Sequence, residues 1–159
     1  MELRDILDEN IIRIGIDAKD KDEALHKMAG LLYENQYIDD IEGFVKDVYA
    51  REAEGETGLG QGVAIPHGES KNAQKLGVAI VTLNHPIEWE TLDGGKVDTI
   101  FLFCVSSDAN FARNHMLLLS KIAARLADDD LLKQIRVASS SCEMIAACGR
   151  GGLKTGDRV

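Results

Sequence analysis

A histidine between a proline and a glycine is the residue of this sequence best placed to do chemistry. His67 stands in Ile65-Pro66-His67-Gly68, directly after the apolar run Val63-Ala64-Ile65. Proline fixes its own φ and extends the residue before it, whereas glycine lets the chain turn and approach a ligand closely. A neutral imidazole held at the end of a strand is nucleophilic near neutral pH and can accept a phosphoryl group. The alternative is a turn histidine that only satisfies hydrogen bonds.

Three glycines upstream of His67 could offer backbone amides to an anion. They are Gly58, Gly60 and Gly62, and a loop without Cβ atoms at these positions can cradle a phosphate. The stretch lacks the Lys-Ser/Thr pair of a P-loop and the spacing of a dinucleotide-binding fingerprint, so it gives no support to ATP or NAD binding. The pattern favours Gly60, Gly62 and Gly68 as phosphate-loop residues.

Two other side chains could act on the same phosphoryl group. His115 lies about one turn into a helix expected to begin near Asn110, where helix-end amides and the helix dipole favour an anion. Because His67 and His115 each follow a predicted strand, the loops that carry them can converge at one edge of a sheet. Arg51, at the end of a predicted helix, can pair with phosphate oxygens through its guanidinium. The alternatives are a packed core histidine and a solvated, salt-bridging arginine.

A metal site is the competing interpretation of the histidines. His67, Glu69, His85 and His115 could form a ligand set, but no His-Glu-x-x-His or Cys-x-x-Cys spacing supports one. We therefore expect neither a metal ion nor another cofactor.

The composition describes an acidic, globular chain. Of its 159 residues 45% are hydrophobic and 28% are charged, and the formal net charge is −9. This length suits one domain, and the negative charge argues against a nucleic acid or an anionic membrane as partner. No apolar run approaches the roughly 20 residues of a spanning helix, and the acidic start is no signal peptide, so we expect no membrane insertion and a cytoplasmic location. Three irregularly spaced cysteines make no disulfide framework, in agreement with a reducing compartment.

The elements that would position these residues alternate between strand and helix. Short apolar or alternating runs predict strands at 10–16, 63–65, 77–83 and 99–105, with turns at 84–86 and 93–95. Apolar residues at three- and four-residue spacing predict helices at 20–34, 41–54, 111–126 and 128–138, the first capped by Asp17, and a short one at 143–148. Such alternation is typical of an α/β sandwich, with helices on both faces of four or five strands. We expect one domain over 1–148 and a flexible tail over 149–159.

The motifs around His67 resemble one family when they are taken together. The resemblance rests on three segments: Arg51 to Gly60 (REAEGETGLG), Gly62 to Gly68 (GVAIPHG), and Asn114-His115 at the start of a leucine-rich helix. In order and spacing, from about residue 3 to residue 146, the chain is similar to type 2 enzyme IIA domains, the fructose and mannitol class of the phosphoenolpyruvate-dependent sugar phosphotransferase system. The resemblance implies the mannitol-type enzyme IIA fold, a mixed sheet with helices on both sides.

The resemblance also implies a phosphoryl relay. The phosphocarrier HPr would phosphorylate His67, which would pass the group to a cysteine of a IIB component and, through IIB, serve a IIC membrane permease for a sugar or hexitol. His115 matches the second active-site histidine of the family and would orient the phosphoryl group or the imidazole. Arg51 matches a family arginine and would offset phosphoryl charge during transfer. No metal or other cofactor would take part.

Two more expectations concern the partners of such a carrier. Proteins that dock, donate and leave need a small, transient interface, and Leu59, Phe111 and Met116 are the candidates for an apolar patch around His67. The alternative to a transport component is a regulatory protein of the nitrogen-related branch, whose phosphorylation state controls its binding to other proteins. A IIB cysteine acceptor would distinguish the two.

Overall fold

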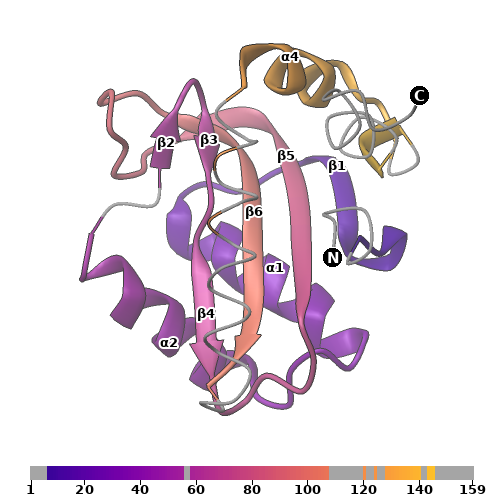
Figure 1. Cartoon of the computed structure of the whole chain (residues 1–159), viewed down its shortest axis with the longest axis vertical. Helices are drawn as coiled ribbons and strands as arrows, with labels where there is room; N and C mark the ends of the chain where they lie inside the picture. The colour runs from indigo at the N-terminus through magenta and orange to yellow at the C-terminus, as the bar shows by residue number, and fades with distance from the viewer. Residues whose placement is uncertain are drawn as a thin grey trace.

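A mixed sheet lies at the centre of the protein (Figure 1). The structure is a computed structural model, and it describes residues 7–55, 58–107, 120, 124, 128–140 and 143–145. In sheet order the described strands are β1 (Ile12–Ile16), β5 (Gly77–Ile87), β6 (Val97–Ser106), β3 (Val63–Ala64) and β2 (Gly58–Gly60), and β4 (His67–Ser70) also pairs with β6. Because β3 and β4 pair with successive parts of β6, the strands fill five positions across the sheet. The predicted mixed sheet of four to five strands is confirmed.

Strand direction sets which ends of the strands share an edge. β5 and β6 are antiparallel, and so are β2 and β3. β1 runs parallel to β5, while β3 and β4 run parallel to β6. His67 pairs with Phe103 and Ser70 pairs with Ser106, so β4 and β6 end side by side.

Helices cover both faces of the sheet, as the sequence predicts. Figure 1 shows α1 (Lys21–Glu34) crossing behind the sheet, and α1 and α2 (Ile41–Glu52) bury one core with residues such as Leu102. On the opposite face α4 (Asp129–Val137) packs its apolar side chains on a second core that includes Phe101. Successive residues of β5 and β6 enter the two cores alternately, because strand side chains alternate between the two faces of a sheet. β6 and the first part of β5, up to Leu83, are therefore almost continuously buried.

Two local predictions are wrong. Asp20, not Asp17, caps α1, because its carboxylate accepts a hydrogen bond from the Glu23 amide at 2.9 Å. The predicted turn at 84–86 belongs to β5, where the register against β6 shifts between Thr82 and Ile87. Pro86 fits there because an irregular ladder does not need its missing N–H.

Two further segments of the chain are strands that the sequence analysis assigns to loops. β2 and β4 are only three and four residues long, and each forms by pairing with a distant or adjoining strand. The 3-10 helix η2 (Glu9–Ile11) also occupies the start of the predicted strand 10–16. Most of the predicted helix 111–126 lies outside the described residues, although Ser120 and Ala124 are helical, and so does the tail 149–159. No helix among the described residues is both long and apolar enough to cross a membrane.

Gly68 allows α2 to pack directly on β4. A Cβ atom at this position would lie 2.2 Å from Cζ of Phe44, a buried residue of α2. The phenyl ring of Phe44 therefore occupies the space that the Cβ atom of any other residue at position 68 would need. This contact sets the distance between α2 and the strand that carries His67.

We expect Gly68→Ala to lower the free energy of unfolding by about 1–3 kcal/mol, because the added methyl overpacks the Phe44 site. Chemical denaturation measures this change, and the double variant Gly68→Ala/Phe44→Leu should recover part of it. Gly30→Ala is the matched control: its Cβ meets nothing within 4 Å in the interior of α1, so it should raise stability by roughly 0.5–1 kcal/mol. Equal stability of Gly68→Ala and the wild type would contradict this account of the α2–β4 contact.

Candidate active site

His67 lies where one strand position of the sheet is interrupted. It is the first residue of β4, and only Ile65 and Pro66 separate it from β3. Pro66 keeps the segment paired, since its carbonyl accepts a hydrogen bond from the Phe103 amide at 2.9 Å. The imidazole is 8% exposed and its centroid lies 5.5 Å from that of the Phe103 ring. His67 therefore follows β3 as predicted, but it opens a new strand instead of a loop.

The environment of His67 favours a neutral imidazole. Nδ1 is buried and has no hydrogen-bond partner among the described residues. Burial and then the positive charge of Arg51 lower the pKa of His67 to about 4, against a smaller opposing effect of the Ile65 backbone. At neutral pH the ring is consequently unprotonated and one of its nitrogens carries a free lone pair, as a nucleophile requires.

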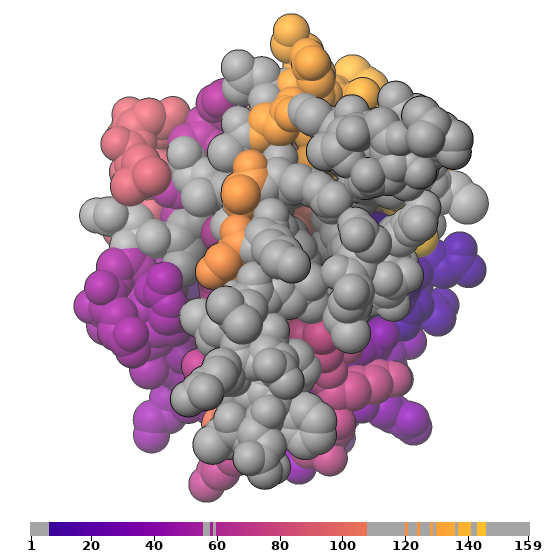
Figure 2. Space-filling view, in the orientation of Figure 1, coloured from indigo at the N-terminus to yellow at the C-terminus, as the bar shows by residue number. Residues whose placement is uncertain are grey.

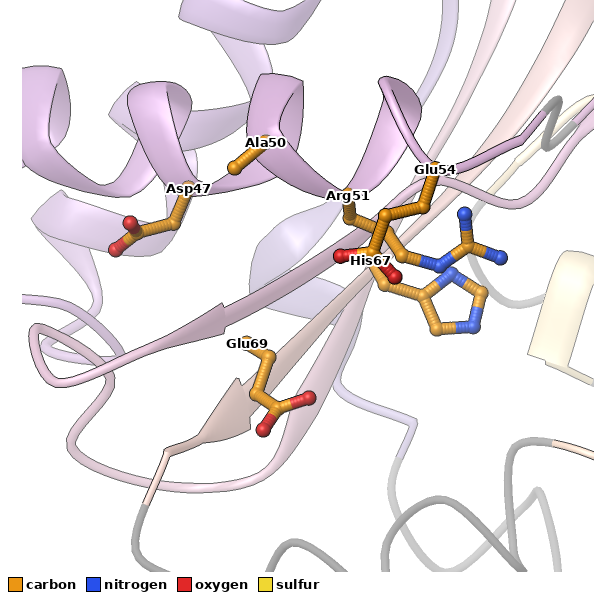
Figure 3. Close-up of a pocket in the computed structure, with 6 residues that line it drawn as sticks. All are labelled: Asp47, Ala50, Arg51, Glu54, His67 and Glu69. Carbon is orange, nitrogen blue, oxygen red and sulfur yellow. The ribbon is translucent and has the colours of Figure 1, made fainter.

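Arg51 reaches this imidazole from the last turn of α2. Figure 3 shows its guanidinium next to the ring of His67. Arg51 Nη1 also donates a hydrogen bond to the carbonyl of Gly55 at 3.1 Å, which ties the side chain to the end of its own helix. The two residues that the sequence analysis places at one site, His67 and Arg51, are brought together by the packing of α2 on β4.

A cavity of about 300 Å³ opens beside these two residues. Figure 3 shows the described residues that line it: Asp47, Ala50, Arg51, Glu54, His67 and Glu69. The sequence analysis weighs Glu69 only as a metal ligand and misses the other two carboxylates. Helical spacing from Arg51 would have found Asp47 and Glu54, since residues three and four apart share a helix face. A phosphate in this cavity would meet one guanidinium among several carboxylates.

The glycine-rich stretch forms a tight hairpin between β2 and β3. Gln61 and Gly62 at its tip have φ values of 56° and 82°, and Gly60 has 97°. The Gln61 amide donates to the carboxylate of Asp93 at 3.0 Å. One backbone amide of the predicted anion cradle is thus already bound to a carboxylate of the protein itself. Neither Gly60 nor Gly62 is among the described residues that line the His67 cavity, and Gly68 serves the packing of Phe44.

The structure describes some of the remaining candidate residues and leaves others outside the described ranges. His26 bridges α1 and α2, with Nε2 3.2 Å from Glu42 Oε1, and His85 lies exposed on β5. Among the described residues no three or more His, Cys, Asp or Glu side chains come together as a metal site. His115, Phe111, Met116 and the side chain of Leu59 lie outside the described residues, so their roles stay predictions.

Comparison with known proteins places this arrangement in a family. Residues 5–149 match the family described as phosphoenolpyruvate-dependent sugar phosphotransferase system, EIIA 2. The chain is 34% identical, over 136 residues, to the 2-O-alpha-mannosyl-D-glycerate-specific EIIABC component of Escherichia coli. That alignment covers 84% of this chain and 20% of the relative, so the chain spans about a fifth of its length.

Two solved structures share the fold. The nitrogen regulatory protein IIA-Ntr of Neisseria meningitidis has a TM-score of 0.81 and 28% identity, and the match covers 91% of this chain and 97% of that one. The enzyme IIA of mannitol from Escherichia coli, solved in complex with phosphorylated enzyme IIB, has a TM-score of 0.73 and 19% identity, with 91% and 97% covered. The predicted mannitol-type fold is confirmed by this second match. Because the family matches nearly the whole length of this chain, the chain belongs to the type 2 EIIA family of the phosphoenolpyruvate-dependent sugar phosphotransferase system.

Proposed function

We propose that this chain is a phosphoryl carrier that accepts a phosphoryl group on His67 from phospho-HPr and passes it to a cysteine of a IIB component. The observation that carries the proposal is the buried, neutral imidazole of His67 with the Arg51 guanidinium beside it in a cavity. The reaction needs no metal ion, because positioning and charge stabilisation are the main tasks of a protein in phosphoryl transfer between side chains.

The burial of Nδ1 supports Nε2 of His67 as the attacking atom. Its lone pair forms a new P–N bond to phosphorus while the P–N bond of the donor histidine breaks, so one imidazole replaces another. In the second step the thiolate of the IIB cysteine forms an S–P bond as the P–N bond at His67 breaks. Arg51 offsets the phosphoryl charge in both steps, and His115 orients the group or the ring. Both steps conserve the phosphoryl group and consume no water.

The names of two relatives support the transport branch of the system. The E. coli relative is an EIIABC component, and the mannitol IIA neighbour was solved with phosphorylated IIB. These names support a IIB acceptor, a IIC permease reached through IIB, and uptake of a sugar or hexitol through that permease. The carrier itself would act in the cytoplasm. Leu59, Phe111 and Met116 would form the apolar patch on which these carriers dock.

A regulatory role is the second candidate function. IIA-Ntr of N. meningitidis has the higher TM-score of the two structures, and this chain covers 97% of it. A protein of that kind would keep its phosphoryl group and would change its binding to other proteins with phosphorylation.

Transfer to an acceptor tests the proposal and separates the two candidates. The phosphorylated chain is mixed with a IIB domain that has its active-site cysteine, and with the same domain carrying serine at that position. The transport proposal predicts that the phosphoryl group moves from His67 to the cysteine and stays on His67 in the serine control. Retention of the group with every IIB domain of the host would refute the transport role and favour the regulatory one.

A further inference from the structure

Three separate segments meet at the ammonium group of Lys21. Lys21 begins α1, Glu52 ends α2 and Glu90 lies in the loop between β5 and β6. Lys21 Nζ is 2.6 Å from Glu90 Oε1 and 3.5 Å from Glu52 Oε2. One positive charge therefore ties the end of α2 to α1 and to this loop. Figure 2 shows α2 and the loop one above the other along one rim of the molecule.

The Lys21–Glu52 ion pair is largely buried, whereas the Glu90 side chain is 66% exposed. The side chains of Lys21 and Glu52 are 15% and 5% exposed. Lys21 Nζ also lies 4.8 Å from the centroid of the Trp89 ring and 5.7 Å from that of Tyr49, where aromatic faces attract a cation. Removing one member of such a buried pair leaves the other charge uncompensated, so the link constrains its partners more strongly than an exposed ion pair does.

The cluster is directly connected to the His67 cavity, because Glu52 follows Arg51 in α2. The His67 cavity lies on one side of this last helical turn, and a second cavity of about 550 Å³ lies on the other. Glu54 lines both cavities, and Lys21 lines the second one. A turn bordered by two cavities is held less by close packing than a core helix is. The Glu52–Lys21 ion pair is thus a tertiary contact next to Arg51 that holds the turn, together with the Tyr49–Asp22 hydrogen bond at the preceding helical turn.

We propose that Lys21 is a positioning residue, which fixes the last turn of α2 and thereby holds the Arg51 guanidinium beside His67. Lys21 lies in the neighbouring cavity, so it acts through Arg51 and not on the phosphoryl group. The position of the Arg51 guanidinium can be tested in the unphosphorylated protein. The consequence for phosphoryl transfer rests on the proposed function.

The pH titration of the His67 ring, followed by NMR, reports on this placement without any donor. Because the charge of Arg51 contributes to the low pKa of His67, a displaced guanidinium raises the titration midpoint. We expect Lys21→Met to raise the midpoint in the same direction as Arg51→Met, and Lys21→Arg to restore it. Lys27→Met is the matched control, since Lys27 lies on the same helix, is about half exposed and is 3.8 Å from Glu23; it should leave the midpoint unchanged.

Two more variants keep the proposal open to refutation. Glu52→Gln tests the same link if Lys21→Met does not fold, and it should shift the midpoint likewise. In an Arg51→Met background, Lys21→Met should add no shift. With a phosphoryl donor, Lys21→Met should be labelled about tenfold to a hundredfold more slowly, as expected for a displacement near 1 Å at a reacting site.

An unchanged His67 titration in both Lys21→Met and Glu52→Gln would overturn the proposal, even if both variants lost thermal stability. A further shift from Lys21→Met in the Arg51→Met background would also overturn it, because Lys21 would then act on His67 by another route. A wild type that no donor labels would refute the proposed function, and the titration would still decide the role of Lys21.

Discussion

We expect His67→Ala to lose all phosphoryl labelling by phospho-HPr, because the variant lacks the nitrogen that forms the P–N bond. The methyl group of alanine is no nucleophile, and among the described residues His67 is the only histidine in the cavity beside Arg51. Labelling is measured as the initial rate of incorporation from radioactive phosphoenolpyruvate in the presence of enzyme I and HPr.

A matched variant separates this loss from a general effect of removing a histidine. His85 lies exposed on β5, away from the cavity residues, so His85→Ala should be labelled at the wild-type rate. Circular dichroism of both variants establishes that each is folded. Labelling of folded His67→Ala at the wild-type rate would eliminate His67 as the phosphoryl acceptor.

The second large effect concerns stability between pH 7 and pH 4. The folded pKa of His67, about 4, lies below the ordinary value of 6.5, so the unfolded chain binds a proton in this window that the folded protein does not. His67 alone should therefore lower the free energy of unfolding by about 3 kcal/mol as the pH falls from 7 to 4, given 1.36 kcal/mol per pKa unit. The loss begins near pH 6.5 and ends near pH 4.

Comparison with His67→Gln isolates this contribution, since glutamine does not titrate. Urea unfolding of the wild type and of His67→Gln at a series of pH values should show the wild type losing stability faster over this window. Comparison with His26→Gln should show the opposite effect: relative to that variant, the wild type should gain stability as the pH falls. The Asp22 carbonyl and then the Glu42 carboxylate raise the pKa of His26, so its stabilising contribution is complete below pH 6.5 and disappears as the pH rises through the folded pKa. Parallel stability curves for His67→Gln and the wild type would contradict the buried, neutral state of His67.

The parts of the fold that the sequence predicts well depend on local patterns. In α1 the buried residues recur at three- and four-residue spacing, and the central stretches of β5 and β6 are continuously apolar, as strands covered on both faces should be. The class of fold and the helices α1 and α2 follow from these patterns.

The errors in the strands occur where pairing with a second strand decides the structure. β2 is three residues rich in glycine, and it forms only because β3 lies beside it in the hairpin. β4 forms because β6 offers a free edge from Phe103 to Ser106. The residues at 84–86 have turn propensity, but they continue β5 past an irregularity in the ladder. The residues of each such segment, taken alone, do not show which strand it pairs with.

The candidate site likewise combines residues that local sequence patterns predict with residues that they do not. Residue type and spacing single out His67 and Arg51, because proline, glycine and a helix end are visible in the sequence. The glycine spacing predicts a phosphate loop, whereas the Gln61 amide in this hairpin donates to the Asp93 carboxylate, which is distant in sequence. The carboxylates of Asp47, Glu54 and Glu69 join the cavity only through the packing of α2 on β4, which depends on Gly68.

Mass analysis of the wild-type chain after incubation with phosphoenolpyruvate, enzyme I and HPr tests the central claim most directly. Intact mass is measured before and after mild acid, and fragments are analysed at alkaline pH, where phosphohistidine survives. The account predicts a gain of one acid-labile phosphoryl group, located on His67. No gain, with the donor proteins shown to be active on another carrier, would contradict it, and so would a phosphoryl group located on any other residue.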